Sequence, residues 1–309
     1  MRISILMIML LLPCIAQSQP ADNSLRLSIG LFTDCQSADA PAKNNRQYQL
    51  SLSKLTECVQ TQNNRRPLFV VQLGDLIDHD YQSYSAVQSI LAGLKPHLYN
   101  VLGNHDFSVS DAQKTQIPAL LEMPSRYYDV VANGWRFIFL DGNELSLYAW
   151  PAGSAEDNAS RAYYVTLKNE PAKYNGAIGP KQLKWLKEVL SLAEANNQPV
   201  VIFCHLPIWP TAKDNLWNAS EILEEIESHP CVKAYICGHK HAGNYTERNG
   251  VHYLNLKGMV EGIENSFAIM EFSKDQIKVI GFGREPSRTL AIKSAPTASS
   301  LPASQPVAK

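Results

Sequence analysis

The sequence predicts an α/β fold in which a single domain combines parallel and antiparallel strand pairing. Three observations favour this fold. Short apolar runs alternate with helical periodicity in the first third of the chain, an Asn-Gly pair separates two β-rich runs near the middle, and further apolar runs fill the C-terminal part. Alternating strands and helices are typical of βαβ units, whose right-handed crossovers build a parallel sheet.

The first third of the chain contains the pattern of two consecutive βαβ units. The predicted elements are a strand at 25–33, a helix at 47–62, a strand at 68–73, a helix at 84–94 and a strand at 98–102. The helical segments carry apolar residues at intervals of three and four, and the strands are short buried runs. Each strand ends at a polar residue, so we expect polar side chains at one edge of the sheet.

The rest of the chain predicts a hairpin, two helices and further strands. The Asn133-Gly134 pair is a strong turn signal between strands at 127–131 and 135–140. Residues 142–178 have no clear period and predict an insertion loop. The remaining elements are a helix opened by Pro180, a strand at 200–204, a helix at 219–229, a strand at 232–237, and successive antiparallel strands at 251–256, 266–272 and 276–282.

Composition excludes several classes of protein. Apolar residues make up 45% of the 309 residues, which is too many for an intrinsically disordered chain. Twenty-eight Lys and Arg balance 29 Asp and Glu, so no basic surplus exists to bind nucleic acid by charge alone. The length fits one large domain with a sizeable core. We therefore expect no nucleic-acid partner, although composition does not choose among enzymes, binding modules and structural domains. A small-molecule substrate and a monomer are expected as well, and the motifs below are the basis for the substrate.

Both termini are expected to lie outside the folded domain. Residues 1–18 contain one Arg, an apolar run that Pro13 ends, and small residues before Gln19, which is the pattern of a secretory signal peptide. The run is too short to span a membrane. We expect an exported protein, periplasmic or extracellular, with a domain at 24–290 and a disordered Ala-, Ser- and Pro-rich tail at 291–309. The five cysteines of the mature chain are expected to be buried reduced thiols.

Polar residues recur at the carboxyl ends of five predicted strands, where ligands bind in open α/β sheets. The candidate metal ligands are Asp34, Gln36, Asp75, Asn104, His205, His239 and His241. Asp34 and Gln36 are two residues apart, so on an extended chain they point to the same side, as do His239 and His241. Carboxylate, amide and imidazole groups suit Mn²⁺, Fe or Zn²⁺ rather than Ca²⁺. Seven ligands suit two cations that share Asp75.

These motifs resemble those of the calcineurin-like metallophosphoesterases. The chain shows Asp34-Cys35-Gln36, Gly74-Asp75 followed by Asp78, Gly103-Asn104-His105-Asp106, His205, and Gly238-His239-Lys240-His241. Gln36 stands where most of that superfamily has His, which is similar to the manganese-dependent ADP-ribose/CDP-alcohol diphosphatase subgroup. The likeness runs from about residue 29 to residue 288. It implies a four-layer α/β/β/α sandwich with two mixed sheets.

The resemblance also implies a dinuclear metal site and a hydrolytic mechanism. One divalent cation, most consistent with Mn²⁺, would take Asp34, Gln36, Asp75 and His241, and the other would take Asp75, Asn104, His205 and His239. A hydroxide that bridges them would attack phosphorus in line. His105 would stabilise or protonate the leaving oxygen, and Asp106 would fix its tautomer. Arg46, Asn104 and His105 are the predicted substrate contacts. Arg46 and Lys213 either meet a second phosphate or are ordinary surface charges.

The substrate class is less sharply indicated than the chemistry. Aromatic residues in the insertion and after His205 either stack a nucleobase or pack the loops onto the domain; they are Tyr148, Trp150, Tyr163, Tyr164, Tyr174, Trp209 and Trp217. The leading hypothesis is an exported enzyme that cleaves a phosphodiester or diphosphate bond in nucleotide-type substrates such as ADP-ribose or CDP-alcohols. The alternatives are a phosphomonoesterase or phosphodiesterase for non-nucleotide esters, and a non-catalytic binding protein with the same fold.

Overall fold

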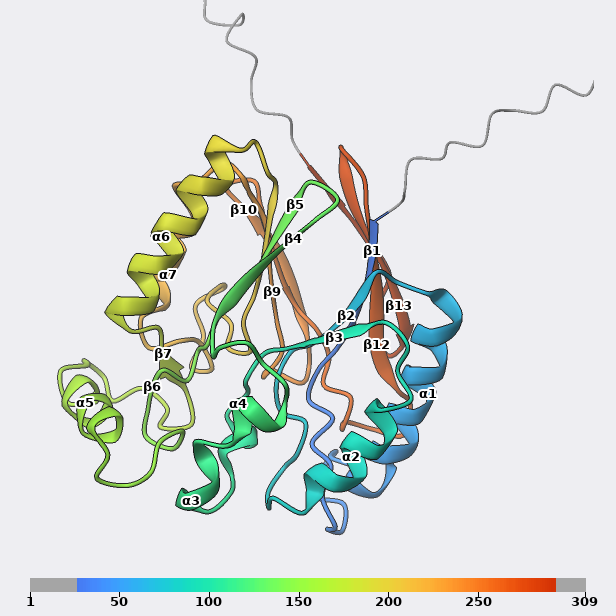
Figure 1. Ribbon diagram of the computed structural model, residues 1–309, viewed down its shortest axis with the longest axis vertical. Helices are drawn as coiled ribbons and strands as arrows, with labels where there is room; N and C mark the ends of the chain where they lie inside the picture. The colour runs from blue at the N-terminus through green and yellow to red at the C-terminus, as the bar shows by residue number, and fades with distance from the viewer. Residues whose placement is uncertain (1–26, 293–309) are drawn as a thin grey trace, which may run out of the picture.

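The computed structural model describes residues 27–292, which form two six-stranded β-sheets with helices on their outer faces (Figure 1). The predicted signal peptide at 1–18 and most of the predicted tail at 291–309 lie outside the described residues. The strand order is β14-β13-β12-β1-β2-β3 in the first sheet and β10-β11-β9-β8-β5-β4 in the second. No helix among residues 27–292 has the length and hydropathy that a membrane span requires.

The first sheet is built from the two predicted βαβ units and a C-terminal meander. Its elements are β1 (Leu27–Phe32), α1 (Ser51–Arg65), β2 (Phe69–Gln72), α2 (Ser83–Leu91), β3 (His97–Asn100), β12 (Ser266–Phe272), β13 (Gln276–Gly283) and β14 (Arg288–Ala291). β1, β2 and β3 pair in parallel, as predicted, and β12 pairs antiparallel with β1. A 3-10 turn, Tyr48–Leu50, precedes α1.

The second sheet begins with the predicted hairpin. Its elements are β4 (Tyr128–Ala132), β5 (Trp135–Phe139), α6 (Pro180–Ala195), β8 (Val200–Phe203), α7 (Ala219–Glu227), β9 (Val232–Cys237), β10 (Asn244–Arg248) and β11 (Val251–Asn255). Asn133 and Gly134 both have positive φ, 46° and 79°, which fits the tight hairpin turn. Short helices α3 (Asp111–Lys114) and α4 (Ile117–Leu120) connect the first sheet to the second.

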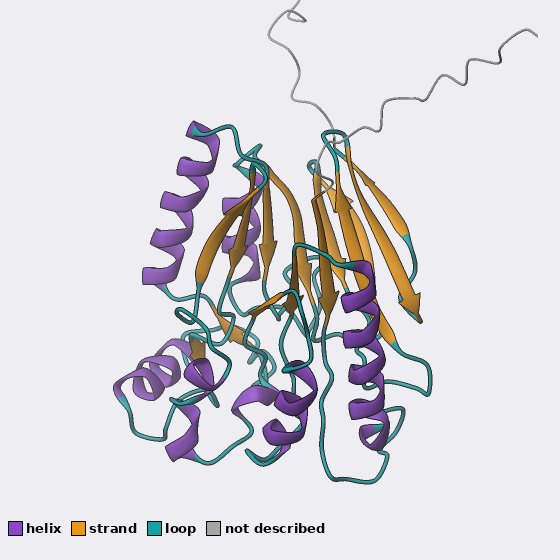
Figure 2. Ribbon diagram, turned by 45° about the vertical axis from the view of Figure 1, so that its right-hand side comes forward, coloured by secondary structure: helices purple, strands orange, loops and turns teal. Residues whose placement is uncertain are grey.

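One buried apolar cluster lies between the two sheets, and one lies between each sheet and the helices on its outer face. The molecule is therefore a four-layer α/β/β/α sandwich (Figure 2). Side chains of both sheets interdigitate between them, and Phe137 and Phe203 are fully buried there. α1 and α2 cover the outer face of the first sheet, and α6 and α7 cover that of the second. Each large apolar side chain buried in this way contributes about 1.5–3 kcal/mol. The predicted fold class is confirmed.

The predicted insertion loop at 142–178 is wrong in part. It contains β6 (Leu145–Ser146), α5 (Ala155–Tyr164) and β7 (Gly176–Ala177). Ser154 caps α5 by accepting a hydrogen bond from the Asp157 N–H. The buried positions of this helix are the polar residues Asp157 and Ser160, so apolar periodicity does not reveal it.

The predicted run of successive antiparallel strands after residue 250 is also wrong in part. β11 belongs to the second sheet, where it pairs in parallel with β9 and antiparallel with β10. The chain then crosses to the first sheet, where β12 and β13 are antiparallel as predicted. β10 and β14 were not predicted. Local sequence identifies strands, but the choice of sheet depends on partners distant along the chain.

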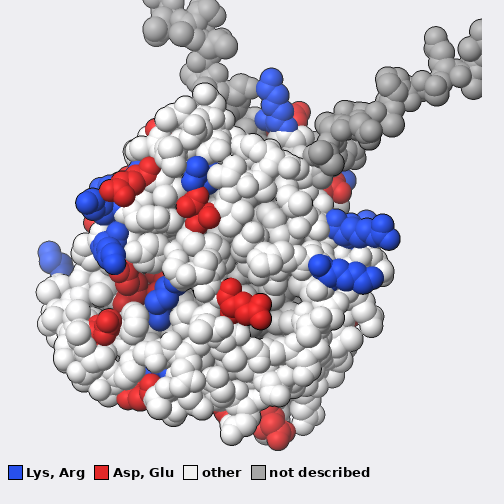
Figure 3. All heavy atoms as spheres, viewed as in Figure 1, with Lys and Arg blue, Asp and Glu red and all other residues white. Residues whose placement is uncertain are grey.

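The five cysteines among the described residues are free thiols, as predicted, and four of them are buried. Charged side chains of both signs are interspersed on the face shown in Figure 3, and no broad basic area covers it. This agrees with the near-neutral composition.

Candidate metal centre

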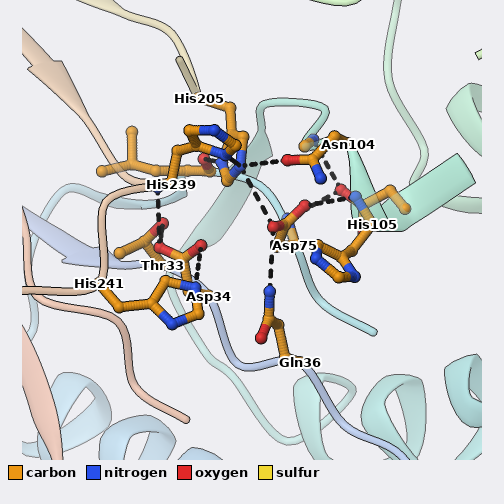
Figure 4. A network of polar contacts seen from close by, with 12 residues as sticks. Thr33, Asp34, Gln36, Asp75, Asn104, His105, His205, His239 and His241 are labelled. Atoms are coloured by element: carbon orange, nitrogen blue, oxygen red, sulfur yellow. Dashed lines mark hydrogen bonds and ion pairs between the residues drawn. The ribbon is translucent and has the colours of Figure 1, made fainter. Parts of the chain in front are cut away.

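The seven predicted metal ligands meet where the carboxyl ends of both sheets converge (Figure 4). The first sheet supplies Asp34, Gln36, Asp75 and Asn104, and the second supplies His205, His239 and His241. His205 Nε2 lies 3.2 Å from Asp75 Oδ2, and His241 Nε2 lies 3.3 Å from Asp34 Oδ1. Both of these contacts join one sheet to the other. The site therefore depends on the packing of the sandwich as well as on the strand-end motifs.

The backbone is in the left-handed region at four of these residues. The φ angles are 50° at Asp34, 43° at Gln36, 60° at Asp75 and 69° at His239. The prediction that Asp34 and Gln36 share a side because the chain is extended is therefore wrong in its reason, although both side chains reach the site. Such conformations cost free energy and persist where the surrounding structure imposes them, typically at functional sites.

The glycines that precede three of the ligands provide room for close approach. A Cβ at Gly103 would overlap the Asp75 carboxylate and backbone nitrogen, and one at Gly238 would overlap the Thr33 hydroxyl. Gly74 also has φ of +102°, so only this one of the three needs the conformational freedom of glycine. Space for close approach is therefore the requirement that the three positions share.

Each of the three imidazoles has one nitrogen held by an acceptor outside the site. His205 Nδ1 donates to the Leu73 carbonyl at 2.8 Å, and His241 Nδ1 donates to the Glu261 carboxylate at 2.8 Å. His239 Nε2 lies 3.1 Å from Asn175 Oδ1, while the Asn175 amide nitrogen donates to two carbonyls. The other nitrogen of each ring faces the site. This arrangement is typical of histidines that bind metal.

Gln36 Oε1 is fully buried and lacks a hydrogen-bond partner among the described residues. Asp34 Oδ1 is buried as well, and it meets His241 Nε2 at 3.3 Å without a hydrogen bond. A buried polar atom without a partner is costly unless a cation or a water satisfies it. Asp75, His205 and His239 also place one ligand atom each within 4.8 Å of one another. The donor set therefore fits divalent cations on both sides of Asp75.

The protonation states reflect a dense cluster of opposite charges. Burial disfavours the charged form of His205, but the Asp75 and Asp34 carboxylates outweigh it and raise its pKa to about 9. Burial likewise disfavours the charged form of His241. The Asp34 carboxylate, and then that of Glu261, outweigh this and raise the pKa of His241 to about 9. Burial and the neighbouring His205 lower the pKa of His239 to about 3. Cation binding requires neutral imidazoles, so it must displace protons from His205 and His241.

The catalytic candidate His105 lies beside this cluster, but Asp106 does not fix its tautomer as predicted. His105 Nδ1 instead lies 2.8 Å from the Asp78 carbonyl and 3.3 Å from Asp78 Oδ1. A carbonyl only accepts, so Nδ1 carries the proton and Nε2 is left for the pocket. The error arose because Asp106 is adjacent in sequence, whereas the 3-10 turn His105–Phe107 directs the two side chains apart.

Asp106 has a structural role that sequence analysis missed. Its carboxylate is fully buried and accepts hydrogen bonds from the backbone N–H groups of Asp75, Leu76 and Gly103, and from the Tyr84 hydroxyl. Burial, followed by the nearby Asp75 charge, raises the pKa of Asp106 to about 6. Asp106 is therefore a positioning residue that joins the strand ends carrying Asp75 and Asn104.

We expect Asp106→Ala to lower the free energy of unfolding by roughly 3–5 kcal/mol, because three buried N–H groups lose their acceptor. Asp106→Asn keeps one acceptor oxygen and is expected to cost less. Urea unfolding of both variants measures this difference. Equal stability of Asp106→Ala and the unaltered protein would show that the hydrogen bonds of Asp106 do not support the strand ends that carry Asp75 and Asn104.

A pocket of about 440 Å³ opens over the cluster. Its lining includes all three predicted substrate contacts, Arg46, Asn104 and His105. Lys213, Lys240 and Asp214 also line it, and Lys240 and Asp214 were not singled out from the sequence. Arg46 Nη1 forms an ion pair with Asp78 Oδ1 at 3.2 Å. A larger hollow of about 570 Å³ beside β3 and α4 contains none of the predicted site residues.

Of the seven aromatic candidates for base stacking, only Tyr174 lines this pocket. Its hydroxyl donates to Asp214 Oδ1 at 2.7 Å, and its ring lies 5.7 Å from that of His239. Tyr163 and Tyr164 pack on Trp217, and the Trp150 indole donates to the Glu144 carbonyl. Loop packing is thus the role of most of these aromatics.

Comparison with known proteins supports the family resemblance that the sequence motifs predict. The sequence profile of the family described as Calcineurin-like phosphoesterase matches residues 27–243. The chain is 32% identical to the human manganese-dependent ADP-ribose/CDP-alcohol diphosphatase, over 88% of this chain and 95% of that protein. It is 29% identical to the Arabidopsis thaliana protein of the same name, over 83% and 94%.

A solved structure is also similar. The dimetal phosphatase from Danio rerio superposes with a TM-score of 0.78 and 26% sequence identity, covering 86% of this chain and 99% of that chain. The family profile, the similar sequences and the similar structure all carry the name of a phosphoesterase or phosphatase. The chain therefore belongs to the calcineurin-like phosphoesterase family and is a metal-dependent phosphoesterase.

Proposed function

We propose that the protein is a dinuclear-metal hydrolase that cleaves the diphosphate bond of nucleotide-type substrates, such as ADP-ribose or CDP-alcohols. The position of Asp75 carries the proposal. Its Oδ2 lies 3.2 Å from both His205 Nε2 and Gln36 Nε2, so one carboxylate connects the two groups of predicted ligands. The names of the similar human and plant proteins supply the substrate class.

The residues divide into two ligand sets around Asp75. Asp34, Gln36, Asp75 and His241 would hold one cation, and Asp75, Asn104, His205 and His239 would hold the other. Two bound divalent cations supply Lewis acidity, which provides a hydroxide nucleophile near neutral pH and offsets charge on the phosphoryl oxygens. Gln36 offers a neutral oxygen, so we propose Mn²⁺, with Fe and Zn²⁺ as alternatives.

Other residues of the pocket would bind and orient the substrate. His105 holds a proton on Nδ1 against Asp78, so its Nε2 is available to interact with the leaving oxygen. Arg46, Lys213 and Lys240 bring three positive charges to the pocket, whose lining also carries the Asp75 and Asp214 carboxylates. Because Asp75 is assigned to the cations, these three side chains suit a substrate with more than one phosphate, since each phosphoryl group adds negative charge.

A substrate panel tests the proposal. Mature protein is incubated with Mn²⁺ and ADP-ribose, CDP-choline, bis-nitrophenyl phosphate or nitrophenyl phosphate. We expect cleavage of the two diphosphates to dominate. Activity on the monoester alone would contradict the proposal, and no activity on any of the four would favour a binding protein. Two tightly bound Zn or Fe ions in protein purified without added Mn²⁺ would contradict the choice of metal.

We also propose that the protein is exported, periplasmic or extracellular, on the basis of the N-terminal sequence. The expected mature chain begins at Gln19. N-terminal sequencing of protein from the producing cells measures this position, and an intact Met1 in the folded, active fraction would contradict export.

A further inference from the structure

The acceptor that holds His241 differs from those that hold the other two imidazoles. His205 donates to a main-chain carbonyl and His239 contacts a neutral amide, whereas His241 donates to the carboxylate of Glu261. Glu261 thus brings the only formal charge among these three outer contacts. His241 belongs to the same proposed ligand set as Gln36, which, like Asn104 in the other set, offers only a neutral amide oxygen.

Glu261 lies on a loop at 258–262 that a buried lysine holds in place. Lys54 of α1 is 4% exposed, and its ammonium donates to the carbonyls of Met259, Glu261 and Gly262 at 2.9, 3.1 and 2.6 Å. An ammonium has three N–H donors, so all three are satisfied here. Burial of such a charge is costly unless it is fully hydrogen-bonded, which indicates that the loop has a defined position.

The loop at 258–262 contacts one predicted ligand set directly. Its Val260 N–H donates to the Asp34 carbonyl at 2.9 Å. A Cβ at Gly258 would come within 2.8 Å of the His241 ring, so this backbone packs against the imidazole. The loop therefore fixes Asp34 and His241 together. No contact between this loop and Asn104, His205 or His239 is found among the described hydrogen bonds.

We propose that Glu261, held by Lys54, is a positioning residue that raises the metal affinity of the Asp34/Gln36/His241 site. A carboxylate that accepts from an imidazole fixes the ring and makes its other nitrogen a better donor. This offsets the weak neutral oxygen of Gln36 in the same ligand set. The inference rests on the ligand assignment of the proposed function, and it is independent of the substrate.

Titration of metal-free protein with Mn²⁺, followed by calorimetry and by electron paramagnetic resonance, tests the inference without any substrate. The class of site that Asp34→Asn abolishes identifies the relevant cation. We expect Glu261→Ala to weaken this class by about 10–100-fold and to change the other class less than twofold. Glu261→Gln keeps an acceptor oxygen and is expected to restore part of the affinity. Lys54→Met is expected to weaken the same class.

Asn175→Ala is the matched control, because Asn175 contacts His239 of the other ligand set. It is expected to weaken the opposite class of site. Equal weakening of both classes by Glu261→Ala, or no weakening, would overturn the inference. If Glu261→Ala does not fold by circular dichroism, Glu261→Gln decides, since full affinity with Gln shows that the charge is not needed. Failure of the substrate panel would leave these affinities unchanged, so the two failures are distinguishable.

Discussion

Asp75→Asn is expected to lower kcat/KM by about a thousand-fold or more, corresponding to about 4 kcal/mol of transition-state stabilisation. The reason is that both ligand sets share this carboxylate. Asn tolerates the left-handed φ of 60° and keeps an oxygen that accepts the His105 N–H at 2.7 Å, so the fold should persist. Steady-state kinetics and metal analysis measure the effect, and we expect fewer than two cations per chain.

Asp80→Asn is a suitable control for this variant. Asp80 lies in the same loop, also has a positive φ of 63°, and is exposed. We expect it to retain activity and metal content. An Asp75→Asn protein that binds two Mn²⁺ ions with unaltered kinetics would show that Asp75 is not the shared ligand.

His105→Ala is expected to lower kcat by about 10²–10⁴-fold, the usual range for loss of a general acid or base. Metal content should not change, because the imidazole contacts Asp78 and the backbone N–H that meets Asp75 remains in alanine. The loss should be smaller for nitrophenyl esters, since their leaving group needs little protonation. A pair of substrates that differ in leaving-group pKa measures this contrast.

His79→Ala provides the matched control. His79 contacts the same partner, with its Nδ1 3.0 Å from Asp78 Oδ2, but its side chain is 46% exposed and does not line the pocket. We expect nearly full activity. If His105→Ala loses the same factor with both leaving groups, or loses a cation, its role is in binding rather than in proton transfer.

Much of the fold and the set of candidate metal ligands were predictable from sequence, because the sequence patterns that indicate them are local. Each short apolar strand is followed by a polar residue, and parallel strands bring these ends to one edge. The seven candidate ligands were found in this way and do converge. The hairpin at Asn133-Gly134 was predictable for a similar reason, since two consecutive residues determine that turn.

The helix α5 and the placement of β11 were not predictable in the same way. α5 buries Asp157 and Ser160, so its contacts with the domain leave no apolar stripe. β11 pairs directly with β9, although the unpredicted strand β10 separates the two in sequence. β12, the next strand along the chain, lies in the other sheet. The free energy of each pairing depends on both partners, and one segment alone does not carry that information.

The sequence by itself determined the fold class and predicted the seven candidate ligands and the catalytic candidate His105, because these depend on short motifs at strand ends. Only the tertiary structure decided which side chains orient the imidazoles among these residues. Asp78 rather than Asp106 orients His105, and Asn175 and Glu261 hold His239 and His241. Asn175 and Glu261 lie 64 and 20 residues from their imidazoles. Their identity depends on which loops the two packed sheets bring together, and that packing is a property of the whole chain.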